Sequence, residues 1–193
     1  METFLQNALE RAYDEALDIA YPNDGDTHRA RSVAWLNAIG NSFSQKYDKH
    51  QLVRVFWKQN DQHKEDFGLN ELLHDVLVAE CAESVSPRHG IPIAYIERAL
   101  WQVESELKPD GRAAIIDFSK LVLGSAENKL FVGPLTHNQE TFRNSLLPVA
   151  EACQGNVFAA FIPEPKLWYK KDPEVVAWQY KNSRWEQIVG ELL

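Results

Sequence analysis

The spacing of apolar residues changes near residue 50, and this change constrains the fold more than any other feature of the sequence. Residues 2–20 and 27–47 carry apolar side chains at the i, i+3/i+4 intervals of amphipathic helices. The remainder holds short runs rich in β-branched and aromatic residues, which favour strands. We expect strands at 52–57, 72–81, 95–107, 129–132 and 157–162, further helices at 112–123 and 138–153, and a hairpin over 175–188 that turns at Asn182-Ser183. A run of strands followed by β-helix-β units predicts an α/β (α+β) fold with a mixed central sheet flanked by helices.

The chain has 193 residues and no stretch rich in Gly, Pro and Ser that would separate two domains. We therefore expect one domain over residues 1–193. Within it, residues 1–50 form a helical N-terminal part and residues 163–193 form an aromatic and basic C-terminal hairpin.

The sequence favours a reducing, cytoplasmic location. Its N-terminus is interrupted by charged residues, unlike a secretory signal, and no window approaches the ~20 apolar residues of a membrane span. The two cysteines, Cys81 and Cys153, are too few for a disulfide framework and are expected to be small buried thiols.

The formal charge of −8, from 28 acidic and 20 basic residues, argues against a protein that binds nucleic acid through bulk charge. It leaves room for a local basic face. The six histidines lack zinc-ligand spacing, and no P-loop, dinucleotide or nucleophile-elbow motif occurs.

The run Leu100–Leu107 carries the most informative chemistry. Side chains alternate between the two faces of a strand, so Glu104 and Glu106 are expected on one face, about 7 Å apart. Two like charges this close repel each other and raise one pKa unless a cation lies between them. A hard divalent cation with oxygen ligands would resolve the repulsion.

Asp75 is a polar break in the apolar run 72–78, where it alternates with Leu73 and Leu77. A buried carboxylate without a partner costs several kcal/mol, so Asp75 needs a hydrogen-bonding partner or a metal. If strands 72–81 and 95–107 are adjacent and antiparallel, Asp75 and the glutamate pair can converge on one ion. The alternatives are solvated glutamates on an exposed sheet face and a hydrogen-bonded aspartate at a strand end.

This order of acids resembles the PD-(D/E)xK nuclease superfamily, which has the restriction-endonuclease-like fold. Residues 70–75 resemble its first acidic strand, and residues 103–106 resemble its second motif with Glu106 in place of lysine. In some members the lysine has moved to the following helix, where this sequence has Lys120; the alternative for Lys120 is a surface lysine flanking the core. The resemblance covers roughly residues 27–162.

The resemblance implies hydrolysis of DNA phosphodiester bonds with Mg²⁺ or Mn²⁺. Asp75 and Glu104 would hold the cation, Glu106 would orient the attacking water, and Lys120 would stabilise charge on the phosphate oxygens. Enzymes of this type often pair to cut two strands, which implies a possible homodimer. The sequence departs from the family pattern because it lacks the proline before Asp75 and the lysine within the second motif. A non-catalytic regulatory protein that keeps the fold and binds nucleic acid or protein is therefore the alternative function.

The C-terminal region is the second candidate surface. Between residues 166 and 185, five basic residues stand against two acidic ones, and three tryptophans and two tyrosines lie among them. The basic residues are Lys166, Lys170, Lys171, Lys181 and Arg184. This mixture suits contacts to a nucleic-acid backbone and stacking on bases. The alternative is that the aromatic side chains are part of the core.

Overall fold

A seven-stranded sheet organises the molecule in the computed structural model, which describes residues 2–18, 24–168 and 175–189. The strands are β1 (Val53–Trp57), β2 (Val76–Val85), β3 (Pro92–Ser105), β4 (Asn128–Pro134), β5 (Asn156–Ile162), β6 (Val176–Lys181) and β7 (Arg184–Val189), and they neighbour one another in sequence order. The pairs β3–β4 and β4–β5 are parallel and the other pairs are antiparallel. The expected α+β class with a mixed central sheet is therefore confirmed.

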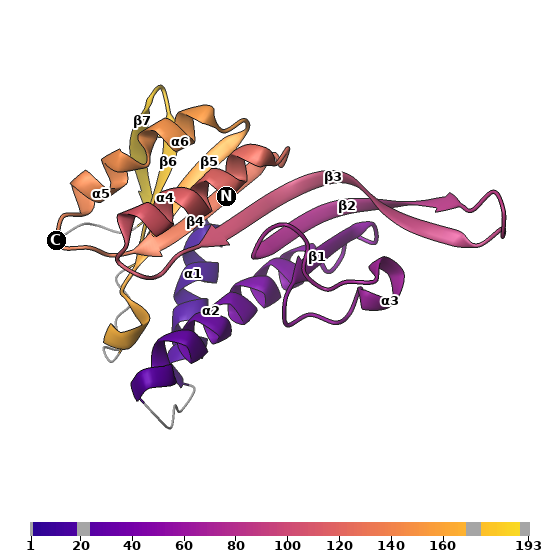
Figure 1. The fold of residues 1–193 in the computed structure, drawn as a ribbon, viewed down its shortest axis with the longest axis horizontal. Helices are drawn as coiled ribbons and strands as arrows, with labels where there is room; N and C mark the ends of the chain where they lie inside the picture. Colours follow the sequence, from indigo (N-terminus) through magenta and orange to yellow (C-terminus); the bar gives the residue numbers. More distant parts are fainter. Residues whose placement is uncertain (1, 19–23, 169–174, 190–193) are drawn as a thin grey trace.

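Helices flank the sheet on both faces (Figure 1). Helices α1 (Glu2–Asp18) and α2 (Asp24–Tyr47) lie on one face, and α4 (Gly111–Lys120), α5 (Gln139–Ser145) and α6 (Leu147–Ala152) lie on the other. The short elements are α3 (Lys64–Phe67) and the 3₁₀ turns η1 (Leu121–Leu123) and η2 (Pro165–Leu167). Within the described ranges, no helix combines the length and apolar character needed to cross a membrane.

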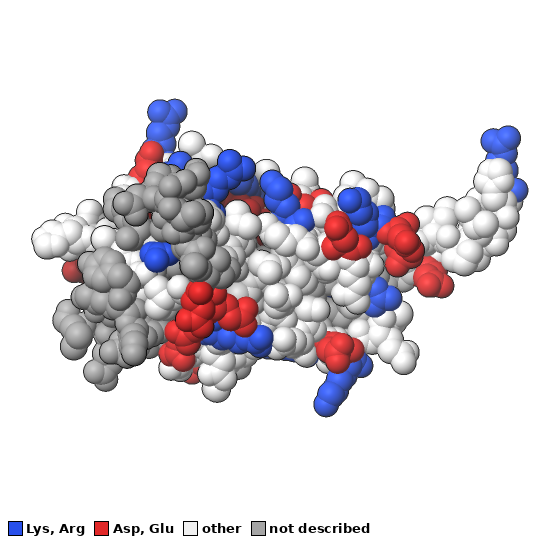
Figure 2. All heavy atoms as spheres, turned by 90° about the horizontal axis from the view of Figure 1, so that it is seen from below, with Lys and Arg blue, Asp and Glu red and all other residues white. Residues whose placement is uncertain are grey.

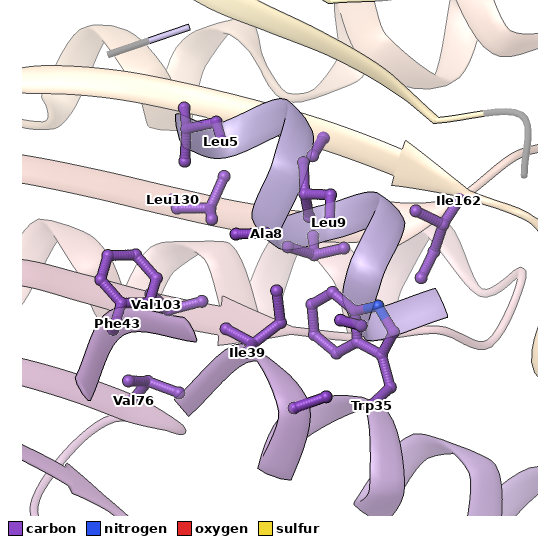
Figure 3. Close-up of a cluster of buried hydrophobic side chains, with 14 of the residues drawn as sticks. Leu5, Ala8, Leu9, Trp35, Ile39, Phe43, Val76, Val103, Leu130 and Ile162 are labelled. Carbon is purple, nitrogen blue, oxygen red and sulfur yellow. The ribbon is translucent and has the colours of Figure 1, made fainter. Parts of the chain in front are cut away.

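The larger core lies between the sheet and the pair α1 and α2 (Figure 3). Trp101 of β3 is fully buried at its centre, with ring centroids 5.2 Å from Phe43 of α2 and 5.7 Å from Phe158 of β5. Its indole N–H donates to the hydroxyl of Tyr47 at 3.1 Å. These contacts hold the middle of β3 in place and thereby fix the strand that ends at the acidic residues.

The second core lies between the sheet and α4, α5 and α6. Phe118 of α4 stacks on Phe131 of β4, with ring centroids 5.1 Å apart, and both rings are fully buried. Asp110 caps α4, because its side chain accepts the N–H groups of Arg112 and Ala113. Helix α4 is therefore anchored by its cap and by its buried face, which fixes where its last residue, Lys120, lies.

The hairpin of β6 and β7 turns at Asn182 and Ser183, as the sequence predicts. Both residues have positive φ, 50° and 61°. A two-residue turn with two positive φ values matches the twist of the strands that it joins.

Two elements of the β2 and α5 regions differ from the expectation. Strand β2 begins at Val76 instead of residue 72, because Trp57, its partner in β1, is the last residue of that strand. Leu73 is accordingly 86% exposed and not part of an apolar strand face. The helix expected over 138–153 is two helices, since Pro148 lies in the first turn of α6 and cannot donate a backbone hydrogen bond.

The strand expected at 95–107 begins earlier, at Pro92, and the loop expected around residues 84–90 is shorter. Strand β2 continues to Val85, and the two strands pair through to Val85 and Pro92. The polar loop over 58–68 also contains the one-turn helix α3. Of the cysteines expected to be buried, Cys81 is buried and Cys153 is half-buried, and both are free thiols.

Gly40 allows α2 to pack closely against β1. A Cβ atom at this position would lie 2.4 Å from the nearest carbon of the Trp57 indole. Alanine is otherwise favoured over glycine in a helix by about 1 kcal/mol. We expect Gly40→Ala to destabilise the protein by about 1–3 kcal/mol in urea unfolding, because the buried indole must shift.

Gly111, in the first turn of α4, is the matched control for this substitution. Nothing lies within 4 Å of a Cβ placed there. Gly111→Ala is therefore expected to leave stability unchanged or raise it by up to about 1 kcal/mol. A Gly40→Ala variant as stable as Gly111→Ala would contradict the close packing described for α2 and β1.

Candidate active site

Two acidic residues lie at the same end of neighbouring strands. Asp75 directly precedes β2, and Glu104 is the penultimate residue of β3. The two strands are antiparallel, and Val76 is paired with Val103. One step further along this register brings Asp75 opposite Glu104. The antiparallel pairing therefore brings Asp75 and Glu104 close enough for the charge of Glu104 to act on Asp75.

Glu104 is a buried carboxylate with two polar partners. Its side chain is 1% exposed. Its Oε1 lies 2.8 Å from Nδ1 of His74, and its Oε2 accepts a hydrogen bond from Nζ of Lys120 at 3.1 Å. A buried carboxylate is tolerated only when it is paired and hydrogen-bonded, and these contacts meet that requirement. The alternative of a solvated Glu104 on an open sheet face is therefore wrong.

Asp75 is held by the strand that carries Glu104. Its Oδ2 accepts hydrogen bonds from the backbone N–H and from the hydroxyl of Ser105, each at 2.8 Å. Burial and then the negative charge of Glu104 raise the pKa of Asp75 to about 6, although the Ser105 hydrogen bonds and the charge of Lys120 act in the opposite direction. The neighbouring carboxylates therefore resist being ionised together, which is the situation that a bound cation relieves.

Lys120 brings a positive charge to these acids from a separate element. It is the last residue of α4, and its Nζ also contacts Oδ1 of Asp117 at 2.6 Å. Partial burial alone would lower the pKa of Lys120, but the hydrogen bonds and charges of Asp117 and Glu104 hold it above its ordinary value. Lys120 is thus a fixed cation at the site. Lys120 contacts two carboxylates, so the alternative of a surface lysine that only flanks the core is wrong.

Glu106 lies just beyond the end of β3. Its Oε1 accepts the backbone N–H of Lys108 at 2.8 Å. Among the described residues, no hydrogen bond or ion pair joins it to Asp75, Glu104 or Lys120. The structure therefore brings three of the four candidate residues together and leaves Glu106 at the rim of the group.

His74 and Ser105 belong to the site, although the sequence analysis did not single them out. Because a carboxylate only accepts, the contact to Glu104 assigns the proton of His74 to Nδ1. In the described part of the chain, Nε2 of His74 is buried without a hydrogen-bond partner. Both contacts join residues about thirty positions apart in the sequence. The sequence therefore offers only one signal, a histidine beside Asp75 in an apolar run.

The donor atoms suit a hard divalent cation held by few protein ligands. The described residues include no group of three or more His, Cys, Asp or Glu side chains placed to hold a metal. Mg²⁺, however, is usually bound through one or two carboxylates, with water and substrate phosphate completing its octahedron. Asp75 and Glu104 supply carboxylate oxygens, the kind of ligand that Mg²⁺ takes, whereas a closed zinc site needs four ligands that are mainly nitrogen and sulfur.

The C-terminal aromatic residues are largely packed inside the molecule. Trp168 is fully buried and Trp185 is 8% exposed, while the guanidinium of Arg143 lies 3.7 Å from the ring centroid of Trp178. The rings of these residues therefore contact the protein, as in the alternative that places the aromatic side chains in the core. Lys181 and Arg184 are exposed, and Arg184 pairs with Glu186 at 3.0 Å. Lys170 and Lys171 lie outside the described residues, as does the side chain of Lys166.

Comparison with protein-family models, curated proteins and solved structures found no match to this chain. The class that can be stated is the one given by its own fold, an α+β protein with a mixed seven-stranded sheet flanked by helices.

Proposed function

We propose that this protein is a metal-dependent nuclease that hydrolyses DNA phosphodiester bonds, with a restriction-endonuclease-like fold of the PD-(D/E)xK type. The observation that carries the proposal is the proximity of Asp75, which precedes β2, to Glu104 of β3 and Lys120 of α4, at one end of the β2–β3 pair. Two carboxylates and a lysine are the groups that the family pattern requires.

Asp75 and Glu104 would hold Mg²⁺ or Mn²⁺. Such an ion polarises the scissile phosphate and lowers the pKa of water bound to it. Ser105 fixes the Asp75 carboxylate, and His74 fixes Oε1 of Glu104. Lys120 would neutralise charge that develops on the phosphate oxygens, and Glu106, at the rim, would orient the attacking water.

DNA as the substrate and a homodimer as the working form extend the same proposal. The candidate contacts to the DNA backbone are the exposed Lys181 and Arg184 of the β6–β7 hairpin. Lys166, Lys170 and Lys171, whose side chains lie outside the described residues, are further candidates from the sequence. Pairing of two copies would allow both strands of a duplex to be cut.

One observation favours a second candidate, a non-catalytic regulatory protein that binds nucleic acid or protein. Glu104 already has a cationic partner in Lys120 and a hydrogen bond from His74. The position that carries lysine in the family motif holds Glu106 instead. In a protein that has kept the fold but lost catalysis, the buried acid would be paired with protein groups and would need no metal.

A cleavage assay on plasmid, single-stranded DNA and RNA, with Mg²⁺ or Mn²⁺, separates these two functions. We expect cleavage of DNA that stops in EDTA and in the Glu104→Gln variant. Glu151→Gln, the same substitution at an exposed site on α6, is the matched control and should cut normally. Absence of cleavage with either metal, or equal cleavage by Glu104→Gln, would reject the nuclease.

His74 is expected to position Glu104 as a metal ligand. Residues that orient metal ligands typically contribute 10–100-fold to metal affinity. We expect His74→Leu to weaken Mn²⁺ binding by roughly 10–100-fold in isothermal titration calorimetry, and His74→Asn, which keeps a donor near Nδ1, to restore part of the loss. His63→Leu is the control, since His63 is also buried but lies against Phe56. Equal affinities for His74→Leu and His63→Leu would exclude this role.

A further inference from the structure

Strands β2 and β3 extend well beyond the rest of the sheet as a two-stranded arm, residues 81–98 (Figure 1). Strand β1 pairs with β2 only as far as Glu80, and β4 pairs with β3 only from Trp101 onward. Among the described residues, the edges of β2 over 82–85 and of β3 over 92–98 therefore have no strand beside them. Open edges of this kind are sites where another chain can pair.

The arm exposes large apolar side chains along its length. Val85, Ile91, Ile93, Tyr95 and Ile96 are between 37% and 62% exposed. Paired residues of neighbouring strands share a face, so Val85 and Ile96 lie on one face of the arm and Ile93 and Tyr95 lie on the other. Exposed apolar side chains at this density mark a contact with another protein. A strand edge and an apolar surface on the same arm favour a partner that supplies both a strand and apolar side chains.

Charge is distributed unevenly along the arm. Figure 2 shows basic side chains at its free end and acidic side chains over its root. Arg88 is exposed in the turn between β2 and β3. A groove of about 210 Å³ between α3 and one face of the arm is lined by Glu65, Asp66 and Glu83, with Arg54 as its single basic residue, and by apolar residues that reach Pro92 near the turn. The basic tip of the arm is therefore complementary in charge to this groove.

A single chain cannot bring Arg88 back to Glu65 and Asp66 of α3, because the paired strands between them are extended. A second copy can, when the two arms lie antiparallel. A nucleic acid is a poor partner here: the two acidic residues of the arm balance its two arginines, and Arg98 is already paired with Glu80 and Glu127.

We propose that the arm is the dimerisation element of this protein. Two copies pair in an antiparallel, two-fold arrangement that covers the face of each arm with Val85 and Ile96, which is also the face of the acidic groove. The tip of each arm, carrying Arg88, enters the groove of the other beside α3. An interface of this type is isologous, so that each contact occurs twice. The proposal is independent of catalysis, because the arm and the acidic cluster lie at opposite ends of β2 and β3.

Sedimentation equilibrium of the full chain tests the proposal. We expect a dimer in which Arg88→Glu and Glu83→Lys each raise the dissociation constant about tenfold or more, since each places like charges together twice. An equimolar mixture of the two variants should recover the dimer, because in the mixed pair each residue 88 meets a residue 83 of opposite charge. Arg112→Glu, on the exposed start of α4, should leave the dimer unchanged.

Four results would overturn the proposal. The wild-type chain could remain a monomer at every concentration, or both charge variants could dimerise as well as the wild type. Mixing the variants could fail to restore a dimer that each had lost. Finally, Arg88→Glu could weaken DNA binding without changing the dimer, which would make the arm a nucleic-acid contact instead. The Glu104→Gln variant should still dimerise, so failure of the nuclease assay leaves this test unaffected.

Discussion

The Asp75→Asn variant is expected to lose DNA cleavage and to be more stable than the wild type in the absence of metal. Asparagine keeps an oxygen that can accept the two hydrogen bonds from Ser105, but removes a negative charge beside Glu104. Loss of one of two carboxylate ligands should reduce cleavage by roughly 10³-fold or more, since metal catalysis supplies several kcal/mol. The same change removes a carboxylate that is buried beside the negative charge of Glu104 in the folded protein, and this should stabilise the fold.

The pKa of Asp75 gives the size and the pH dependence of this stabilisation. Its rise from 3.8 to about 6 corresponds to about 1–3 kcal/mol at pH 8, allowing for the coupling to Glu104. Between about pH 4 and about pH 6, the Asp75 carboxyl is protonated in the folded wild type and ionised in the unfolded chain, so the free energy of unfolding of the wild type falls as the pH rises. The advantage of Asp75→Asn should therefore be absent below about pH 4 and complete above about pH 6.

Urea unfolding in EDTA across this pH range measures the effect, alongside cleavage assays in Mg²⁺. Asp110→Asn is a poor control, because Asp110 caps α4; Asp61→Asn, in an exposed loop, is the suitable one. An Asp75→Asn variant that is less stable than the wild type at pH 8, or that cuts DNA normally, would contradict the arrangement described for Asp75.

The Lys120→Met variant is expected to bind Mn²⁺ at least as tightly as the wild type and to cut DNA about 10²–10³-fold more slowly. Methionine retains much of the length of lysine without its charge. The Nζ of Lys120 contacts Glu104, so its loss frees a carboxylate oxygen for metal. It also removes the fixed cation nearest to the acids, which is the group proposed to act on the phosphate.

Lys108→Met is the matched control, because Lys108 is exposed in the turn between β3 and α4 and carries the same charge close by. It should cut DNA within a few-fold of the wild type, and raised salt should affect the two proteins alike. Equal rates for the Lys120 and Lys108 variants would show that Lys120 has no specific part in the reaction.

The sequence predicts the sheet and its helices well wherever the apolar pattern is local. The hairpin turn at Asn182 and Ser183 has side chains that tolerate positive φ, and strands such as β5 are uninterrupted apolar runs. The sequence pattern places the start of β2 at residue 72 instead of Val76. The strand begins opposite the last residue of β1, which is about twenty positions away in the sequence and cannot be identified from the local pattern. The arm was missed because its isoleucines follow the pattern of a buried strand, yet they are exposed.

Residue types and strand order were sufficient to nominate Asp75 and Glu104 as neighbours, whereas Lys120 was nominated by the family resemblance alone. The partners of these residues were not predictable from the sequence. The contacts of His74 to Glu104 and of Ser105 to Asp75 depend on the exact pairing of β2 and β3, which hydrophobic alternation does not specify. Glu106 was expected beside Glu104, but β3 ends between the two, and the chain then turns so that Glu106 contacts Lys108.

Crystals soaked in Mn²⁺ give the most direct test of the central claim, that Asp75 and Glu104 form a divalent-metal site. Anomalous diffraction locates the ion without assumptions about the ligands. We expect a peak bound to both carboxylates, with Lys120 moved away from Oε2 of Glu104, and no peak in crystals of Asp75→Asn. A map with no ion at these carboxylates, in which Lys120 still contacts Glu104, would contradict the claim.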